Sequence, residues 1–506
     1  MAFYVTTPIY YVNAAPHLGH AYTTIGADIL ARHHRQRGED VFFLTGTDEH
    51  GEPVARVAES QGITPKELAD RNAQRFLDLL PRINVSNDFF IRTSDPRHKR
   101  RVQEVMQRVH DNGHVYKDLY EGLYCPKCAD FKSEGEIGEG DTCLIHVGTP
   151  LDREHEENWF FRLSSFEQPL KELYAQQPDF VAPRSRYNEA LAFINGGLQD
   201  VSLSRAKLTW GVEVPWDPAH VFYVWFDALL NYYTALSFAR DGEDLTDRFW
   251  PASLHILGKD ILKFHAVFWP ALLMAAGLPL PRRELIHGYL LMRDAAGGES
   301  KMSKSLGNVL DPFEVMDAFG TDALRYYCFR EVSFGQDGGV STTTFGERYE
   351  SELANDYGNL ASRMLAMIGR YRAGRVPDVD VDAALSGDFE GLVDEVSALL
   401  DRAEITQALE RIWQRVRRLN RYVEERAPWR LAKDDSQAAA LDTTLRSLAE
   451  GIRVVTVLLH PYMPETAAKL LSALGEDGLA LESASFGARA GGRTVGELPQ
   501  LFPKLQ

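Results

Sequence analysis

The first fifty residues read as a strand, a helix and a second strand, and this order constrains the fold most. Residues 2–7 alternate and are rich in β-forming side chains, whereas residues 16–37 carry apolar positions at helical spacing and end at Gly38. Residues 41–44 then form a short apolar run typical of a buried strand. A helix that joins two such strands makes a βαβ unit, and its strands lie parallel in one sheet. We therefore predict an α/β fold.

The remainder of the chain changes character twice. Residues 118–150 hold three of the four cysteines and many glycines, and alternation returns around 221–290, with strands expected at 254–257 and 284–287. From about residue 346 the pattern is helical, and we expect a loop at 373–388. The expected helices cover 348–372, 391–402, 405–425 and 438–459.

These patterns predict a Rossmann-like parallel sheet split by a metal-bearing insertion and followed by an all-α helix bundle. A chain of 506 residues exceeds one ordinary core, so several domains are expected. We place them at 1–115 (first half of the sheet domain), 116–222 (insertion, with a metal knuckle at 120–150), 223–290 (second half), 291–345 (loop and stem-contact region) and 346–506 (helical domain).

Charge and hydropathy narrow the range of partners. A net charge of −17 argues against broad electrostatic binding to nucleic acid, although a local basic surface stays open. The N-terminus has no basic signal-peptide segment, and the longest apolar run, 266–280, is too short to span a bilayer. We expect a cytoplasmic protein that does not contact membranes.

Pro16-His17-Leu18-Gly19-His20 falls where the first strand gives way to the first helix. A helix N-terminus presents unpaired N–H groups and partial positive charge, which suit a phosphate. Gly19 lets a nucleotide approach the backbone, and His17 and His20 share one helix face. Two histidines at a helix start also occur as a polar cap, so this motif leaves both interpretations open.

A second motif favours the phosphate interpretation. Lys301-Met302-Ser303-Lys304-Ser305 is a doubly cationic segment preceded by Gly297-Gly298, and its lysines can neutralise a triphosphate. No Walker-type or Gly-x-Gly-x-x-Gly loop competes for the nucleotide. The two motifs together resemble the signatures of class I aminoacyl-tRNA synthetases. His17, His20, Lys301 and Lys304 are the predicted catalytic residues, and with Gly19 they form the predicted ATP site.

Four metal-ligand residues occur as two close pairs. Cys125 and Cys128 precede Cys143 and His146 in a C-x2-C-x14-C-x2-H pattern. This spacing matches a closed tetrahedral zinc site, which has no vacancy for substrate, so we predict one structural zinc. The alternative is a set of unpaired buried cysteines. Cys328, alone in an apolar stretch, reads as an ordinary core residue.

Several motifs resemble methionyl-tRNA synthetases, and the resemblance covers nearly the whole chain. They are Ile9-Tyr10-Tyr11-Val12-Asn13, Thr47-Asp48-Glu49-His50-Gly51, Val224-Trp225-Phe226-Asp227-Ala228, Gly258-Lys259-Asp260-Ile261 and Phe264-His265. The resemblance implies that Asp48 holds the amino group of methionine, and that its side chain lies among Ile9, Tyr11, Trp225, Ala228, Leu229, Tyr232, Ile261 and His265. Without the family, Trp225 and Tyr232 would read as core residues.

Two features depart from the family pattern. The knob carries three cysteines and a histidine where other members use four cysteines or two knuckles, and Leu229 stands where some members have proline. Both departures are compatible with a branch of the family.

The helical end resembles the anticodon-binding region of these enzymes. Asn355, Asn359 and Arg363 fall at i, i+4 and i+8, and amide and guanidinium groups suit the edges of splayed-out bases. The resemblance assigns them, with Trp429, to the anticodon of tRNA(Met). Between Arg402 and Arg430 the sequence holds eight arginines and four glutamates, a local basic segment. The alternatives are a solvated helix and a Trp429 buried in the core.

The resemblance implies a methionine–tRNA ligase that uses ATP with Mg²⁺, L-methionine and tRNA(Met), including the initiator. Three other classes stay open at this point: a valine, isoleucine or leucine enzyme, a small nucleotidyltransferase, and a non-catalytic tRNA-binding protein. The valine, isoleucine and leucine enzymes usually have a large editing insertion, and the segment between the two halves of the sheet is too short to hold one. Because the chain ends at Gln506, shortly after the helical region, we expect a monomer.

Overall fold

The computed structural model describes residues 2–127, 130–132, 134–293, 299–301, 311–476 and 478–504. At its centre is a six-stranded sheet in the order β3-β2-β1-β13-β14-β9, and all neighbouring strands are parallel. The four strands predicted from the sequence are all present. The strands are β1 (Ala2–Tyr11), β2 (Asp40–Asp48), β3 (Phe89–Arg92), β9 (Val181–Ala182), β13 (Leu254–Gly258) and β14 (Glu284–His287).

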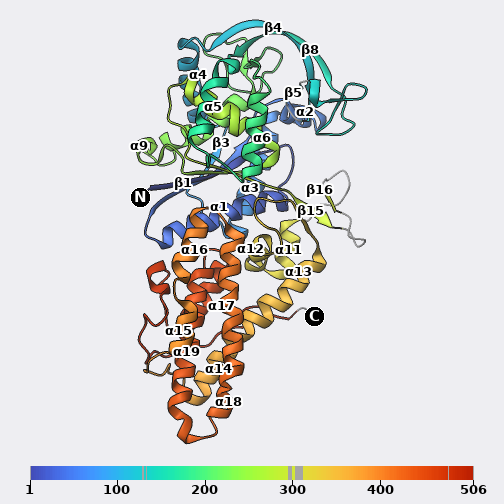
Figure 1. Cartoon of the computed structure of the whole chain (residues 1–506). Coiled ribbons are helices and arrows are strands. Elements are labelled where there is room, and N and C mark those ends of the chain that lie inside the picture. Colours follow the sequence, from blue (N-terminus) through green and yellow to red (C-terminus); the bar gives the residue numbers. More distant parts are fainter. Residues whose placement is uncertain are drawn as a thin grey trace.

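Alternating side chains give this sheet two buried faces. Tyr4 and Phe42 point into a core shared with the insertion, whereas Val5 and Phe43 point into a core shared with the C-terminal helices. In Figure 1 the insertion lies above the blue sheet and the helical domain below it. The predicted α/β class, with a split parallel sheet and a helical end, is confirmed.

The strand order reverses between β1 and β13. From β1 the chain passes through α1 (Leu18–Gln36) to β2 and β3 on one side, and β13 and β14 extend the sheet on the other. In open parallel sheets, ligands bind at the carboxyl ends of the strands where the order reverses. The first helix therefore begins at the place where the fold leaves a crevice.

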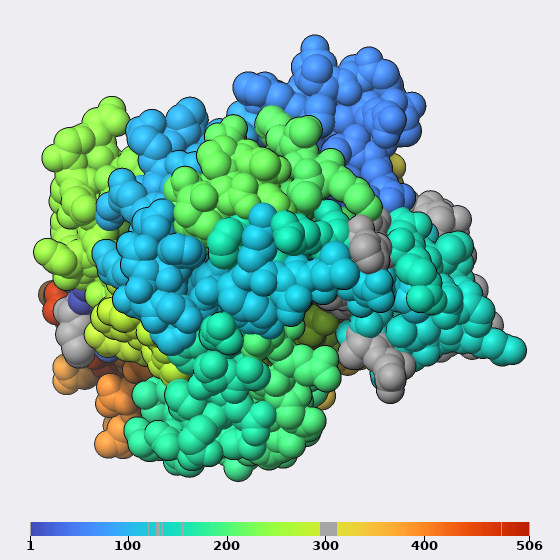
Figure 2. Space-filling model, turned by 90° about the horizontal axis from the view of Figure 1, so that it is seen from above, coloured from blue at the N-terminus to red at the C-terminus, as the bar shows by residue number. Residues whose placement is uncertain are grey.

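The insertion follows α4 (Pro96–Asp111) and is built on a long antiparallel ladder. Strand β4 (Val115–Cys125) pairs with β8 (Asp152–Phe161), from Val115 opposite Phe161 to Tyr124 opposite Asp152. The segment between the two strands forms a knob that projects from the body of the molecule (Figure 2, turquoise). The insertion also holds α5 (Glu167–Gln176), α6 (Arg184–Asn195), β10 (Val201–Ser202), β11 (Ser204–Arg205) and β12 (Val221–Phe222).

The short strand β9 lies within the insertion in sequence but joins the main sheet beside β14. A strand of two residues has no detectable period, so the sequence pattern could not show it. The insertion is consequently anchored to the edge of the sheet as well as through β4 and β8.

The C-terminal part is all-helical, with two differences from the prediction. The helix expected at 348–372 is a succession of α13 (Thr342–Arg348), a π-helical segment (Tyr349–Gly358) and α14 (Asn359–Arg372). The loop expected at 373–388 was wrong in part, because it contains α15 (Ala383–Phe389), whose N-cap Asp382 accepts from the Ala384 N–H at 2.9 Å. The other helices are α11 (Pro312–Phe319), α12 (Thr321–Arg330), α16 (Leu392–Asp401), α17 (Ile405–Arg426), α18 (Pro428–Leu431), α19 (Ala438–Leu459) and α20 (Pro464–Ala473).

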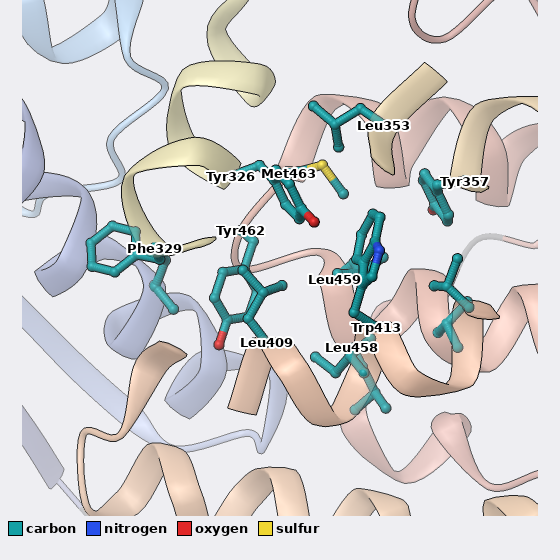
Figure 3. Packing of buried hydrophobic residues seen from close by; sticks show 14 of the residues in the cluster. Tyr326, Phe329, Leu353, Tyr357, Leu409, Trp413, Leu458, Leu459, Tyr462 and Met463 are labelled. Atoms are coloured by element: carbon teal, nitrogen blue, oxygen red, sulfur yellow. The ribbon is translucent and has the colours of Figure 1, made fainter. Parts of the chain in front are cut away.

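Large aromatic side chains fill the core where these helices meet (Figure 3). The fully buried Trp413 of α17 lies near Tyr326 of α12 and Tyr357, with ring centroids 4.7 and 6.1 Å apart. The Tyr462 hydroxyl donates to the Ile405 carbonyl at 2.8 Å, so its polar atom is satisfied inside the core. Cys328 is buried nearby in α12, as predicted, and burial raises the pKa of its thiol to about 12.

A buried arginine joins the helical domain to the sheet domain. Arg325 of α12 pairs with Asp28 of α1 at 2.7 Å, and neither side chain is exposed to solvent. The same guanidinium donates to the Pro461 and Tyr462 carbonyls at 2.7 and 2.9 Å and to the Ile83 carbonyl at 3.0 Å. Because α1 begins at His17-x-Gly-His20, the end of the bundle is fixed against the helix that carries the phosphate motif.

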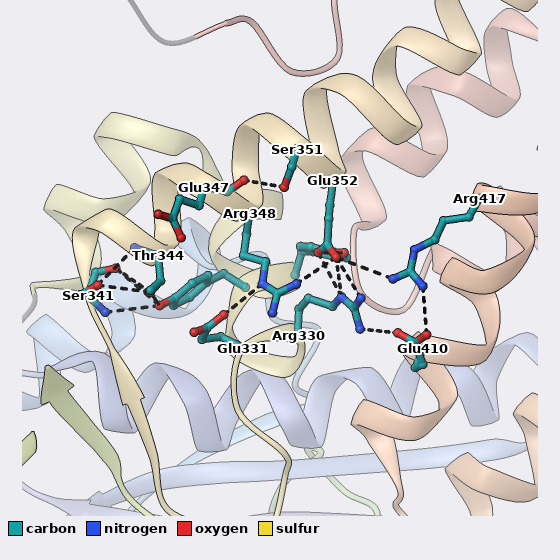
Figure 4. Close-up of polar contacts among 12 residues, drawn as sticks. Arg330, Glu331, Ser341, Thr344, Glu347, Arg348, Ser351, Glu352, Glu410 and Arg417 are labelled. Atoms are coloured by element: carbon teal, nitrogen blue, oxygen red, sulfur yellow. Dashed lines mark hydrogen bonds and ion pairs between the residues drawn. The ribbon is translucent and has the colours of Figure 1, made fainter. Parts of the chain in front are cut away.

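A second polar cluster fixes the helices to one another (Figure 4). Glu352, in the π-helical segment, accepts from Arg330 at 2.9 Å and from Arg348 at 3.0 Å. Arg330 also pairs with Glu410 of α17 at 2.5 Å. Three separate helical elements therefore meet at the buried Glu352 carboxylate, which accepts hydrogen bonds from both arginines.

Among the described residues, no helix has both the length and the hydropathy that crossing a bilayer requires.

Candidate active site

A cavity of about 340 Å³ opens at the carboxyl ends of β1, β2, β13 and β14, where the strand order reverses. It brings together, from both halves of the split sheet, every described residue that the sequence assigned to methionine and the three that begin α1. These residues are Ile9, Tyr11, His17, Gly19, His20, Asp48, Trp225, Ala228, Leu229, Tyr232, Ile261 and His265. The predicted methionine site and the predicted ATP site thus line the same cavity.

One end of the cavity is apolar and aromatic. Trp225 of α7 (Val224–Leu229) stacks on Phe264 with ring centroids 3.7 Å apart, and Tyr11 meets its edge at 6.2 Å. His265 belongs to a π-helical turn (Phe264–Phe268), an irregularity that is frequent at functional sites. Flat walls and polarizable edges suit an unbranched thioether.

Tyr232, of α8 (Asn231–Thr234), and His265 form a fixed hydrogen-bond chain in this wall. The His265 Nδ1 lies 3.0 Å from the Ile261 carbonyl, and its Nε2 lies 2.8 Å from the Tyr232 hydroxyl. Burial lowers the pKa of His265 to about 4, so the ring is neutral, donates from Nδ1 and accepts the Tyr232 proton on Nε2. Both protons are committed, and neither is left for the sulfur of a bound thioether. This wall can therefore recognise the side chain of a bound ligand only through its shape and packing.

Asp48, the last residue of β2, places a buried carboxyl group in the wall of the cavity. Its side chain is buried, and its Oδ1 has no hydrogen-bond partner within the described part of the chain. Burial, and then the charge of Asp227, raise the pKa of the Asp48 carboxyl well above its usual range. Asp227 is itself buried and bound to His50 Nδ1 at 2.8 Å. An orphaned buried carboxylate of this kind fits a cationic ligand group.

The start of α1 holds both histidines in one orientation. His17 is the N-cap residue, and its Nδ1 accepts from the Gly19 N–H at 3.1 Å, while the His20 Nδ1 accepts from the His17 N–H at 3.1 Å. Because both Nδ1 atoms are acceptors, each neutral ring carries its proton on Nε2. A Cβ at Gly19 would lie 2.9 Å from the His17 ring, so only glycine keeps this ring in place. The cap therefore prepares two N–H donors.

Several cavity residues escaped the sequence-based site prediction, among them Asp260, which follows β13, and His287, Gly288 and Tyr289 at the end of β14. The His287 Nε2 lies 2.8 Å from the Thr23 hydroxyl, and this contact joins β14 to α1. The signal was available, because ligands in parallel sheets lie at the carboxyl ends of strands and both strands had been predicted.

The predicted cationic loop falls largely outside the described residues. Lys304 lies outside them, and of Lys301 only the backbone is described, at the end of β16 (Glu299–Lys301). Strand β16 pairs antiparallel with β15 (Leu290–Arg293), and Leu290 lines the cavity. The base of the loop is thus next to the cavity.

Three of the four predicted metal ligands lie together in the knob. The ligand atoms of Cys125, Cys143 and His146 are all within 4.8 Å of one another, and both cysteines are buried. The His146 N–H donates to the Cys143 Sγ at 3.3 Å, a bond that stabilises a thiolate. Cys128, the fourth predicted ligand, lies outside the described residues. The donor set fits zinc.

The residues predicted to read the anticodon lie far along the helical domain. Asn355, in the π-helical segment, and Asn359, at the start of α14, are both exposed. Arg363 pairs with Glu424 at 3.0 Å, and its guanidinium lies 5.7 Å from the Trp429 ring centroid. Trp429 is half-buried against the core, so one part of its surface supports the fold and another is open.

Acidic partners balance much of the arginine-rich segment. Arg402, Arg411, Arg417 and Arg418 pair with Glu404, Glu395, Glu410 and Asp388 at 2.9, 2.8, 3.2 and 2.6 Å. This surface is accordingly less basic than the count of arginines indicated. A phosphate could still replace a carboxylate as the partner of an exposed arginine.

Comparison with known proteins agrees with this architecture. A family model described as tRNA synthetases class I (M) matches residues 3–365, and one described as the anticodon binding domain of methionyl tRNA ligase matches residues 374–491. The parallel sheet, the cavity where its strand order reverses and the two signature motifs define a class I tRNA synthetase.

Individual relatives identify the family. The methionine–tRNA ligase of Streptomyces coelicolor is 45% identical over 100% of this chain and 97% of its own length. That of Caldanaerobacter subterraneus subsp. tengcongensis is 43% identical, over 99% of this chain and 79% of its own. The structure of Mycobacterium tuberculosis methionyl-tRNA synthetase in complex with methionyl-adenylate matches with a TM-score of 0.94 and 42% identity, covering 99% of both chains. This chain belongs to the methionyl-tRNA synthetase family.

Proposed function

We propose that the chain attaches L-methionine to tRNA(Met), including the initiator, in two steps. The carboxylate of methionine attacks the α-phosphorus of ATP, the bond to the β-phosphate breaks, and methionyl-adenylate and pyrophosphate result. A terminal ribose hydroxyl of the tRNA then attacks the methionyl carbonyl carbon, loses its proton and displaces AMP. The observation that carries the proposal is the single cavity, in which an apolar aromatic wall, a buried carboxylate and a helix N-terminus adjoin.

Methionine occupies the apolar end of this cavity. Asp48 pairs with its ammonium, and the side chain lies among Ile9, Tyr11, Trp225, Ala228, Leu229, Tyr232, Ile261 and His265. The buried Asp48 carboxylate supports this placement, since an ammonium supplies the partner that its Oδ1 lacks. The Tyr232–His265 chain keeps the wall rigid.

ATP, bound with Mg²⁺, lies against the start of α1. The Nε2–H groups of His17 and His20 donate to phosphate oxygens as their charge grows, and Gly19 allows close approach. Lys301 and Lys304 neutralise the departing pyrophosphate. This chemistry needs positioning and charge stabilisation rather than a covalent intermediate, and the cap bonds of both histidines support it.

The helical domain contacts the tRNA anticodon through Asn355, Asn359, Arg363 and Trp429. The exposed amides and the open face of Trp429 support this role. We retain the domain limits 1–115, 116–222, 223–290, 291–345 and 346–506, with the qualification that β9 joins the main sheet.

The knob holds one structural zinc through Cys125, Cys128, Cys143 and His146. Zinc bound there would hold the segment between β4 and β8 together, since the described part of that segment consists of short strands and one 3-10 turn. We expect one zinc per chain in elemental analysis. Cys143→Ser should abolish zinc binding and leave methionine activation within a few-fold of wild type, and metal-free wild-type protein would contradict the assignment.

The protein acts as a cytoplasmic monomer. Outside the knob, the exposed large apolar side chains among the described residues are Leu119, Phe193 and Val379, which lie on separate elements and form no broad patch. Light scattering should therefore give the 57.0 kDa mass of one chain. Twice that mass at micromolar concentration would contradict this part of the proposal.

Amino-acid-dependent exchange of pyrophosphate into ATP, screened over all twenty amino acids, tests the activity. Methionine should support the exchange far better than any other amino acid. A preference for valine, isoleucine or leucine would identify another class I enzyme, and no exchange with any amino acid would overturn the proposal.

A further inference from the structure

Helix α3 (Pro65–Arg82) supports the turn that leads from β1 into α1. The Asn72 side chain donates to the Val12 carbonyl at 2.5 Å, and Val12 packs in a small buried core with Ala69 and Ala73 of the same helix. Phe76 follows Asn72 by one turn, so both side chains lie on one face of α3. This face is therefore directed at the segment from which the two histidines of α1 emerge.

Three rings contact the imidazole of His20. Phe76 meets it nearly at right angles, with ring centroids 5.2 Å apart and an interplanar angle of 80°. Tyr10, from β1, meets it at 4.7 Å and 68°, and the His17 ring lies 3.8 Å away. Phe76 and Tyr10 also stack on each other at 5.5 Å and 15°. These separations are within the range of favourable aromatic contacts, so the rings form one packed group.

The Phe76 and Tyr10 rings, which we call the ring clamp, are themselves fixed. They are 2% and 7% exposed, whereas His20 is half-buried. The Thr24 hydroxyl donates to the His20 carbonyl at 2.8 Å and lies 2.8 Å from the Tyr10 hydroxyl. Because Thr24 has one hydroxyl proton, Tyr10 is the donor of the bond that they share. The ring clamp is consequently tied to the first turn of the helix whose histidine it holds.

The helix cap alone fixes one atom of this imidazole. The His20 Nδ1 accepts from the His17 N–H at 3.1 Å, and a single bond of this length allows the ring to tilt about it. Rings packed at right angles to the imidazole oppose that tilt. The direction of the Nε2–H matters for catalysis, since a displacement of about 1 Å can cost about 100-fold in rate.

We propose that Phe76 and Tyr10 are positioning residues for adenylate formation. Their rings hold the His20 imidazole so that its Nε2–H is directed at the phosphate oxygens that gain charge in the transition state. This inference rests on the proposed function, because the orientation of His20 has a catalytic purpose only if His20 donates to ATP. Phe76 acts from a separate helix and touches neither ATP nor methionine.

The test separates positioning from stability. Phe76→Leu keeps an apolar side chain and removes the ring, and Phe42→Leu is the control, because it removes an equally buried ring from β2 in the core shared with the insertion. In methionine-dependent pyrophosphate exchange, Phe76→Leu should lower kcat about tenfold and leave KM for ATP and methionine within about twofold, since the donation strengthens in the transition state. Phe42→Leu should lose similar thermal stability and keep kcat within about twofold of wild type. Tyr10→Phe, which keeps the ring, should lose far less than Tyr10→Leu.

A double-mutant cycle with His20→Asn shows whether Phe76 acts through His20. Removing one such donor costs about 100- to 1000-fold, which leaves a measurable rate. Phe76→Leu should then change kcat by less than about twofold, because the ring that it positions is gone. Equal losses from Phe76→Leu in the wild-type and His20→Asn backgrounds, or equal losses of kcat in Phe76→Leu and Phe42→Leu, would overturn the proposal.

NMR of protein with isotope-labelled histidine tests the contact without any activity. The His20 ring signal, identified by its absence from His20→Asn, should shift in Phe76→Leu and stay in place in Phe42→Leu. An unchanged signal in Phe76→Leu would also overturn the proposal, because the rings would then not be in contact. Wild-type protein that shows this shift pattern but supports no exchange would instead count against the proposed function.

Discussion

The cavity where the strand order of the sheet reverses and the helical surface proposed to contact the anticodon are built in opposite ways. In the cavity, residues from distant parts of the chain converge, and the polar groups of Tyr232 and His265 are already bonded to one another. On the helical surface, Asn355 and Asn359 are exposed, and Arg363 is held by an exposed ion pair to Glu424 and by the nearby Trp429 ring. A small ligand can be enclosed by a preorganised wall, whereas an RNA has to find its donors on an open face.

Breaking the Arg325–Asp28 ion pair, which joins the helical domain to the sheet domain, should have the largest effect on stability. Arg325→Met takes one of two arginine partners from the buried Asp28, which keeps Arg32 at 2.7 Å, and it leaves the buried Pro461, Tyr462 and Ile83 carbonyls without their donor. We therefore expect the free energy of unfolding to fall by about 3 to 5 kcal/mol. Denaturant unfolding followed separately in each domain measures this loss. The double variant Asp28→Leu/Arg325→Met should recover only part of it, because Arg32 then loses Asp28 and the three carbonyls still lack a donor. Equal stability of the single variant and wild type would show that the two regions are joined by packing alone.

Within the cavity, Asp48→Asn removes the charge and keeps the shape. Losing one partner of a buried charge pair costs about 2 to 5 kcal/mol, which corresponds to roughly 30- to 5000-fold in kcat/KM for methionine in the exchange reaction. Binding of tRNA should be unchanged. An exchange rate that stays near wild type would mean that the ammonium lies elsewhere.

On the helical surface, Trp429→Ala should cost about 1 to 3 kcal/mol of tRNA binding, the contribution of one base–aromatic stack. Because Trp429 is only half-buried, the melting temperature of the domain should fall little. A large fall in melting temperature, with equal losses for tRNA(Met) and a tRNA of changed anticodon, would instead indicate a core role.

The smallest effect is a pH dependence confined to the cavity. Burial and Asp227 raise the pKa of Asp48, and binding of an ammonium requires its ionised form. Methionine binding should therefore release a proton, and affinity should fall as pH falls through that raised pKa, by at most about tenfold per pH unit. His265, whose pKa burial lowers to about 4, adds nothing near neutrality. Calorimetry at a series of falling pH values measures the slope, which Asp48→Asn should abolish. A flat wild-type profile would show that Asp48 is ionised throughout.

The sequence predicted elements with a clear apolar pattern better than elements that lie in turn-like or irregular segments. The helix expected at 438–459 coincides with α19, and the strand at 284–287 with β14, since both carry a clear apolar period. Helix α15 was missed because it is short and lies in a segment that reads as turns. The π-helical segment was missed because its residues still follow an approximately helical period.

Motifs predicted parts of the site, but not how its parts support one another. The resemblance indicated Asp48 and His265, whereas no pattern could show that Asp227 raises the pKa of Asp48 or that Ile261 fixes the tautomer of His265. Likewise, no pattern could show that the Phe76 ring of α3 lies against the His20 ring of α1. Such relations depend on residues that are distant in the chain.

If one cavity activates methionine without help from the surface proposed to bind RNA, a variant of that surface should lose charging and keep activation, and this separation is the most direct test. Methionine-dependent pyrophosphate exchange and tRNA(Met) charging are measured side by side for Asp48→Asn and Trp429→Ala. We predict that Asp48→Asn loses both reactions, whereas Trp429→Ala keeps exchange within twofold and loses charging by about tenfold or more. Loss of exchange in Trp429→Ala, at unchanged thermal stability, would contradict the account.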